Sequence, residues 1–261
     1  MTLSNETVQG PAGRLAVTTA GEGGVPVLFV HGNGGRRQQW AAQQEHLGQR
    51  SVALDLRGMG ESERDAAGRY AVEAMAEDVG AVADALKLER FVLVGHSFGG
   101  SVVGAYAARH PERLAGLVFV DAGGDNRGTP QEQLAQLRQG FEPENYEAFT
   151  GAWFEQILQH AKPETKRAVL ESLRATPREV FTAAMWSVLE YDPNPGLRSF
   201  RGPRLSIVAE FLVEAVGDKA LHRLDTELPH RVMSGVSHWL MMDGPQAFNA
   251  ELERFLSRVS G

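Results

Sequence analysis

Residues 91–110 read FVLVGHSFGGSVVGAYAARH, and they carry the clearest fold signal in the sequence. A continuous apolar run from Phe91 to Val94 leads directly into a glycine-rich turn. An apolar stripe at helical spacing follows from Ser101, and Pro111 ends it. The stretch therefore predicts a buried strand, a sharp turn and a helix, in that order.

Similar apolar runs recur on both sides of this stretch. They lack polar alternation, which is typical of strands that are covered on both faces of a parallel sheet. Helical spacing over Ala74–Leu86 separates two of them, and Pro245–Val259 is predicted as a closing helix. Strands and helices in alternation predict a doubly wound, mostly parallel α/β sheet. The other candidate strands are Leu15–Thr18, Val25–Val30, Ser51–Leu54, Leu117–Val120, Leu205–Val208 and Arg231–Met233.

The alternation breaks between about Asp125 and about Leu197. This segment is polar and helix-prone, and it contains no strand-like run. We interpret residues 125–197 as a helical insertion over the sheet, which we call the cap, with residues 1–124 and 198–261 as the core. Its aromatic residues predict either a modest apolar substrate pocket or the packing of the cap itself: Phe141, Tyr146, Phe149, Trp153, Phe154, Phe181, Trp186 and Tyr191.

Composition excludes several classes of protein. Hydrophobic residues make up 43% of the 261 residues, enough for a large core, and there is no cysteine for disulfides, thiolate catalysis or metal binding. A formal charge of −7 gives no electrostatic footprint for nucleic acid or an anionic membrane. Residues 1–7 carry no signal-like pattern, and no apolar run is long enough to span a bilayer. We expect a soluble cytoplasmic protein that binds neither nucleic acid nor a membrane; the oligomeric state stays open.

The turn Gly95–Gly100 has the glycine-x-serine-x-glycine spacing of a nucleophile elbow centred on Ser97. The glycines leave room for a sharp strand-to-helix turn, and the helix N-terminus directs unpaired N–H groups at a developing oxyanion. The alternative interpretation is a turn that only packs a helix on a strand, and the strand-turn-helix context favours the elbow over it. A phosphate-binding loop is excluded because Ser101 stands where lysine is required. Gly58-Met59-Gly60 fails as a dinucleotide motif because Glu63 replaces the third glycine.

Four segments, taken together in this order, resemble the α/β-hydrolase superfamily over nearly the whole chain outside the cap. They are His31–Gly35, Asp55–Ser62, the elbow, and Ser237-His238-Trp239 followed by Asp243-Gly244-Pro245.

The resemblance implies a role for each matching residue. It makes Ser97 the nucleophile and His238 its general base, and the backbone N–H groups of Phe98 and Asn33 the oxyanion hole. We interpret His31 and His96 as structural, bonded to nearby backbone.

The triad acid departs from the common pattern of this superfamily. Its aspartate usually follows the penultimate strand, but Leu212 stands at the aligned position. Asp121, at the end of the strand after the elbow helix, matches the alternative position and is favoured. Glu210 is the next candidate because its longer side chain has more reach. Asp125, Glu214 and Asp218 are further candidates.

These residues predict hydrolysis of small to medium carboxylic esters or lactones through an acyl-enzyme, without a cofactor. A metal site is not expected, because the eight histidines are scattered and none forms a zinc-binding pair. Carbon–carbon bond hydrolase and perhydrolase activities stay open, as does a ligand-binding receptor with little turnover, which the missing aspartate suggests.

Other charged groups are given structural interpretations. Asp55–Ser62 is interpreted as a structural turn beneath the site. Arg36 and Arg37 beside the oxyanion loop, and the Glu73, Glu77 and Asp78 carboxylates, are expected to lie in solvent.

Overall fold

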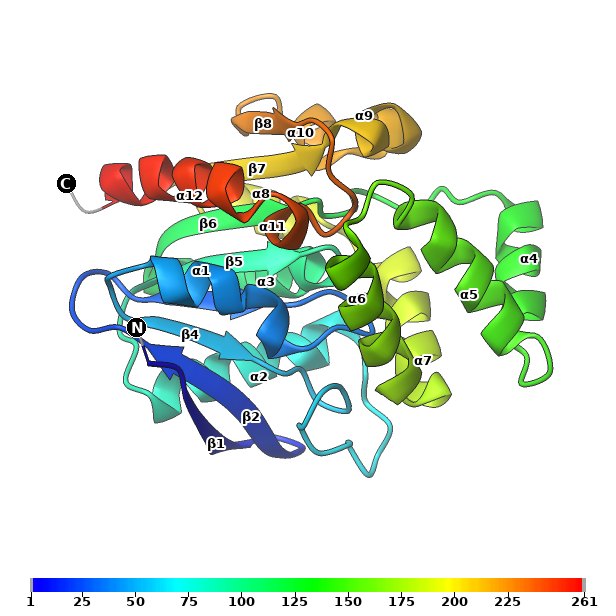
Figure 1. The fold of residues 1–261 in the computed structure, drawn as a ribbon, viewed down its shortest axis with the longest axis horizontal. Helices are drawn as coiled ribbons and strands as arrows, with labels where there is room; N and C mark the ends of the chain where they lie inside the picture. Colours follow the sequence, from blue (N-terminus) through cyan, green and yellow to red (C-terminus); the bar gives the residue numbers. More distant parts are fainter. Residues whose placement is uncertain (1, 260–261) are drawn as a thin grey trace.

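The structure, a computed structural model, describes residues 2–259, with the side chains of residues 214–216 excepted. A single eight-stranded sheet has the order β1-β2-β4-β3-β5-β6-β7-β8 and lies between two layers of helices (Figure 1). The β1–β2 and β2–β4 pairs are antiparallel and all others are parallel, so the predicted doubly wound, mostly parallel α/β fold is confirmed. The strands are β1 Ser4–Gly10, β2 Gly13–Ala20, β3 Val27–Val30, β4 Ser51–Leu54, β5 Phe91–His96, β6 Leu114–Val120, β7 Arg204–Ala209 and β8 His230–Met233.

Strand β1 was not predicted. It pairs with β2 from Ser4 opposite Thr19 to Gly10 opposite Gly13, and of its side chains only that of Val8 is buried. A polar edge strand has no apolar face to bury, so the sequence pattern gives no signal for it.

Helices cover the two faces of the sheet as two sets. One face carries α2 (Val72–Ala85), α3 (Phe98–Arg109) and α8 (Asn194–Ser199). The opposite face carries the short helix η1 with α1, α11 and α12, and helical segments join β7 to β8. The helices of the opposite face are η1 Arg37–Trp40, α1 Ala41–His46, α11 Leu240–Asp243 and α12 Pro245–Val259. The helical segments between β7 and β8 are α9 Glu210–Val216, η3 Gly217–Lys219 and α10 Leu221–Leu224.

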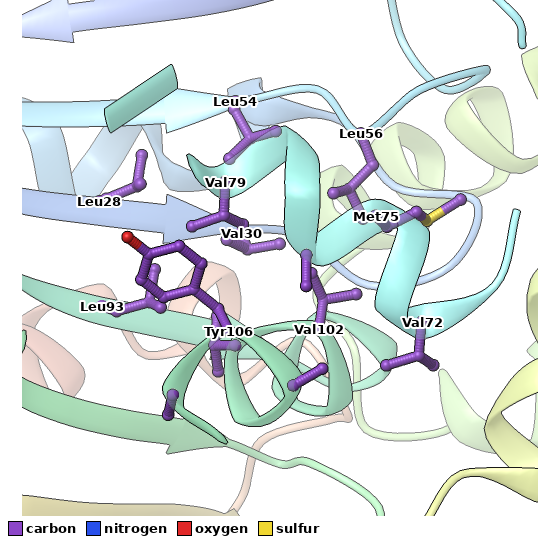
Figure 2. Close-up of a cluster of buried hydrophobic side chains, with 14 of the residues drawn as sticks. Leu28, Val30, Leu54, Leu56, Val72, Met75, Val79, Leu93, Val102 and Tyr106 are labelled. Atoms are coloured by element: carbon purple, nitrogen blue, oxygen red, sulfur yellow. The ribbon is translucent and has the colours of Figure 1, made fainter. Parts of the chain in front are cut away.

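Alternation along the buried strands divides the core in two. In β3, Leu28 and Val30 pack with α2 and α3 (Figure 2), whereas Val27 and Phe29 pack into the core on the other face. Side chains of successive strand residues point to opposite faces, so a strand buried on both faces is apolar throughout. This explains why the buried strands appear in the sequence as continuous apolar runs.

The segment between β6 and β7 is helical throughout its regular structure and extends beyond the carboxyl ends of the strands (Figure 1). Helix α8 crosses residue 197, where the cap was predicted to end, and packs on α3: a Cβ at Gly196 would lie 2.5 Å from the carbonyl oxygen of Gly104. The other helices are α4 Gln131–Phe141, α5 Tyr146–Ile157, α6 Pro163–Ala175 and α7 Arg178–Glu190. Among residues 2–259, no helix combines the length and apolar character needed to cross a membrane.

Two groups that were expected in solvent are buried instead. The side chain of Arg37 is 2% exposed; it pairs with the buried carboxylate of Asp55, and its other nitrogen lies 2.9 Å from Glu61. Asp78 is fully buried and lies 2.7 Å from the guanidinium of Arg57. Both predictions were wrong because each charge pairs with a residue about 20 positions away, and a buried charge requires such a partner.

Hydrogen bonds to Asp55 hold the turn Asp55–Ser62, which follows the carboxyl end of β4. The Asp55 carboxylate accepts hydrogen bonds from the backbone N–H groups of Arg37 at 2.5 Å and Glu61 at 2.9 Å, and Ser62 Oγ donates to the Asp55 carbonyl at 2.7 Å. These contacts agree with the structural interpretation of this turn.

Candidate active site

Ser97 occupies a strained turn between β5 and α3. Its φ of 53° and ψ of −121° lie outside the regions that L-residues usually adopt. Its N–H donates to the carbonyl of Val120 at 2.9 Å, and its own carbonyl accepts from the N–H of Gly100 at 2.8 Å. These bonds tie the turn to the end of β6 and to the first turn of α3.

Glycine is required on both sides of this serine because the backbones approach closely. A Cβ at Gly95 would lie 2.3 Å from the carbonyl oxygen of Gly99, and one at Gly99 would lie 2.4 Å from that of His31. The neighbouring loop is equally close, since a Cβ at Gly32 would lie 3.0 Å from the Cβ of Ser97. The elbow therefore packs directly against the loop that begins at His31.

The two predicted oxyanion donors lie beside this serine. Asn33 and Phe98 line one cavity together with Ser97. Within the described part of the chain, neither backbone N–H donates a hydrogen bond. Phe98 also opens a helix of 12 residues, whose N-terminal dipole favours negative charge. The side chain of Asn33 donates to the carbonyl of Phe181 at 2.9 Å and so fixes its loop to the cap.

His238 lies on the loop between β8 and α11. Its carbonyl accepts from Nε2 of His96 at 2.9 Å, and its N–H donates to the carbonyl of Ile157, at the end of α5, at 3.4 Å. The preceding residue, Ser237, donates its N–H to Asp243 at 2.9 Å. The loop is thus fixed to the core and to the cap.

Asp121 directly follows β6 and reaches the imidazole of His238. Its Oδ2 lies 2.7 Å from His238 Nδ1, and its Oδ1 accepts from the backbone N–H of Ala209 at 2.8 Å. Its side chain is 3% exposed and its φ is 45°. The structure thus brings the favoured acid candidate to the histidine.

The other acid candidates lie elsewhere. Glu210 is exposed at the start of α9, and Asp125 pairs with Arg127 at 2.6 Å. Asp218 belongs to η3, and the side chain of Glu214 lies outside the described residues. Leu212, at the position aligned with the usual aspartate, lies on α9.

The two neighbouring histidines, His31 and His96, form hydrogen bonds with backbone groups. His31 lies with Nδ1 2.7 Å from the carbonyl of Gly32, and its Nε2 accepts from the N–H of Leu56 at 3.1 Å. Burial lowers the pKa of His31 and lowers that of His96 well below its usual value. A neutral His96 that bonds the His238 carbonyl carries its proton on Nε2. These contacts match the structural interpretation of both residues.

Two cavities meet at Ser97 and His238. One, of about 140 Å³, is lined by the oxyanion candidates and by Phe154, Phe181 and Met185 of the cap. The other, of about 200 Å³, reaches past Asp121 to β7 and α10. Among the described residues no hydrogen bond joins Ser97 to His238, a bond that often tightens only with bound substrate.

Sequence reasoning missed the residues of the second cavity. Ser206 and Val208 on β7 and His222 on α10 belong to no motif, and only the fold brings them beside Ser97 and His238. Within residues 2–259, no three His, Asp or Glu side chains are grouped so as to hold a metal ion.

This chain is similar to several known proteins. A family model described as alpha/beta hydrolase fold matches residues 25–245. A protein of Caulobacter vibrioides (strain NA1000 / CB15N), named "Putative carbamate hydrolase RutD", is 30% identical over 249 residues, which cover 88% of this chain and 89% of that protein. The 2-succinyl-6-hydroxy-2,4-cyclohexadiene-1-carboxylate synthase of Enterobacter sp. (strain 638) is 33% identical over 195 residues, which cover 70% of this chain and 72% of that protein.

A solved structure is also similar to this chain over nearly its whole length. An enzyme described as degrading N-acyl homoserine lactones superimposes with a TM-score of 0.81 at 25% identity, and the match covers 96% of this chain and 100% of that chain.

Proposed function

The chain belongs to the α/β-hydrolase fold family and is a hydrolase, and we propose that it cleaves small to medium carboxylic esters or lactones. In this proposal Ser97 is the nucleophile, His238 its general base and Asp121 the acid of the triad. The observation that carries it is the 2.7 Å contact between Asp121 and His238, at the cavity that Ser97 lines.

The reaction begins with the substrate carbonyl beside Ser97. Nε2 of His238 takes the hydroxyl proton while Oγ attacks the carbonyl carbon, and the N–H groups of Asn33 and Phe98 bind the oxyanion. Removing one such donor in other hydrolases costs a factor of about 10²–10³ in kcat.

The tetrahedral intermediate then collapses. His238, now an imidazolium stabilised by Asp121, gives its proton to the leaving oxygen, and the carbon–oxygen bond breaks to leave an acyl-enzyme. Water enters, His238 removes its proton, and attack on the acyl carbon releases the acid and restores Ser97. The Ser97 proton leaves with the alcohol, and the proton that His238 takes from water is passed to Ser97 Oγ, so the enzyme returns to its starting state without a cofactor.

Asp121 can act from β6 because of the order of the strands. Parallel neighbours β5, β6 and β7 end at the same edge of the sheet, which brings Ser97, Asp121 and Ala209 close together. The N–H of Ala209 donates to one carboxylate oxygen of Asp121 and orients the group. The other carboxylate oxygen accepts Nδ1–H of His238. This arrangement supplies the acid whose absence after β7 suggested the receptor alternative.

The substrate class rests on the first cavity and on the relatives. Its cap side is formed by Phe154, Phe181 and Met185, which suit a hydrocarbon acyl group. One similar protein is described as degrading N-acyl homoserine lactones and another is named for carbamate hydrolysis, and lactones and carbamates both contain a carbonyl that carries a heteroatom leaving group. An ester or lactone carbonyl is the simplest member of that class.

The test is multiple turnover of p-nitrophenyl butyrate. Ser97→Ala is expected to lower kcat/KM by at least about 10⁴-fold, because the nucleophile is lost. Ser101→Ala is the matched control, since this buried serine lies one turn further along α3 and lines neither catalytic cavity. Equal turnover by native protein and Ser97→Ala would overturn the assignment. A stoichiometric burst without turnover would favour the ligand-binding alternative.

A further inference from the structure

The nucleophile lies at the junction of two separate cavities. Both are lined by Ser97, Gly123, Trp153, Ile157 and His238, and beyond these residues they diverge. A tetrahedral intermediate on Ser97 carries two organic arms, the acyl chain and the leaving group, which point away from each other. The site therefore provides one cavity for each arm.

The positions of the catalytic groups indicate which arm enters which cavity. The oxyanion candidates Asn33 and Phe98 line only the first cavity, whereas Asp121 lines only the second. The leaving oxygen must face Nε2 of His238, which protonates it, and His238 lines the second cavity whereas the two oxyanion candidates do not. We infer that the leaving group extends into the second cavity and the acyl chain into the first.

The second cavity lies between β7 and the segment that follows it. Ser206 and Val208 share one face of β7 and line it from the sheet, because alternate strand residues point the same way. Leu212 and Val213 of α9 and Leu221 of α10 line it from outside the sheet. Because Asp121 supplies the carboxylate from β6, the segment after β7 is free to carry apolar residues at the usual acid position.

His222 gives this cavity a polar group without a partner. It lines the cavity, and its Nδ1 is buried with no hydrogen-bond partner among the residues that the structure describes. Its ring stacks on that of His230, with centroids 4.3 Å apart and planes at 20°. Burial, and secondarily His230 and Arg223, lower the pKa of His222, so the imidazole is neutral near pH 7 and can donate or accept.

We propose that the second cavity is the leaving-group subsite and selects alcohol or lactone portions that carry a hydrogen-bonding group, which His222 and the buried hydroxyl of Ser206 recognise. This inference rests on the proposed function. A site built to hydrogen-bond its substrate discriminates strongly against an analogue that lacks the group, because its own polar atoms then stay unpaired.

The test compares 3-hydroxypropyl butyrate with n-butyl butyrate, which differ by a hydroxyl in place of a terminal methyl. Acid release is followed by titration. The native protein is expected to prefer the hydroxylated ester in kcat/KM, and His222→Phe to lower that preference about tenfold by loss on this ester alone. Phenylalanine keeps a ring to stack on His230. His230→Phe is the matched control, because His230 is exposed and does not line the cavity, and it should leave the preference unchanged.

A second variant tests the assignment of the second cavity by reducing its volume. Leu212→Trp is expected to fill it and to slow esters of longer alcohols severalfold, while the profile along p-nitrophenyl acetate, butyrate and hexanoate keeps its shape. The opposite pattern, a shortened acyl profile with alcohols unaffected, would overturn the assignment, as would an unchanged ester preference in His222→Phe. Absence of p-nitrophenyl butyrate turnover by the native protein would overturn the proposed function and the subsite with it.

Discussion

Backbone strain singles out two residues of the candidate site. Among the described residues, Ser97 and Asp121 are two of the three non-glycine residues with positive φ, and the third is Lys87. Such conformations cost about 1–3 kcal/mol each and persist where surrounding contacts hold them. Here the N–H of Ser97 bonds to Val120 and that of Asp121 bonds to Ile207. The strain therefore coincides with the two side chains that the proposed mechanism must position.

The role of Asp121 is tested by Asp121→Asn. The amide keeps the size of the carboxylate, and its oxygen still accepts from Ala209, but its NH₂ group then faces Nδ1 of His238. The imidazole is forced to carry its proton on Nε2, where it cannot act as a base. We expect kcat/KM for p-nitrophenyl butyrate to fall by about 10³–10⁴. Steady-state kinetics measure the loss, and thermal unfolding checks that the variant folds.

Glu210→Gln is the control for this substitution. Glu210 is exposed on α9, and we expect kcat/KM to stay within about twofold of the native value. Loss of activity in Glu210→Gln with retention in Asp121→Asn would reverse the assignment of the acid.

Sequence reasoning could rank Asp121 but could not decide between it and Glu210. The elbow is local, so its glycine spacing predicts its own geometry. The acid depends on which strand ends lie beside His238, and that follows from the order β5-β6-β7 and from the path of the loop after β8. Arg37 and Asp78 were placed in solvent for the same reason, since their partners are distant in sequence.

At the level of elements, the helix after the elbow depends on the absence of side chains at its start. Gly99→Ala would place a Cβ 2.4 Å from the carbonyl oxygen of His31, a backbone atom that cannot move without shifting the oxyanion loop. We expect a loss of about 1–3 kcal/mol in the free energy of unfolding, with a fall in kcat. Urea unfolding and steady-state kinetics measure the two effects.

Gly151→Ala provides the opposite case. This glycine lies inside α5, and a Cβ there meets nothing within 4 Å. Because glycine is a poor helix former, the substitution should stabilise the protein by up to about 1 kcal/mol. Equal effects of the two substitutions would contradict the steric argument for the elbow.

Two elements that the sequence did not predict, β1 and α9, lack a local signal. Strand β1 is polar and exposed, so it has no hydrophobic period, and α9 follows β7 without a break, so the sequence shows no boundary between the strand and the helix. The buried strands and α12 were predicted because burial on the core imposes an apolar pattern.

At the scale of the whole molecule, buried neutral histidines make stability depend on pH. His31 and His96 are fully buried, and burial lowers the pKa of each in the folded protein. In the unfolded chain both titrate near 6.5, so below that pH the unfolded state binds more protons. Stability is therefore fully present above about pH 7.5 and declines as pH falls through 6.5 toward the lowered folded pKa values.

The decline can be measured as the urea-unfolding free energy between pH 7.5 and 5.5 at constant ionic strength. A histidine that stays neutral over this whole range contributes a loss of about 1.4 kcal/mol, so the two together contribute at most about 3 kcal/mol. His96→Gln removes the histidine whose pKa is lowered most strongly among the described residues, so it should lower the slope markedly, whatever its effect on stability at pH 7.5. His110→Gln, at an exposed position, should leave the slope unchanged. A slope that is the same in His96→Gln as in the native protein would mean that His96 takes up a proton in the folded state, which its Nε2 bond to the His238 carbonyl and its complete burial oppose.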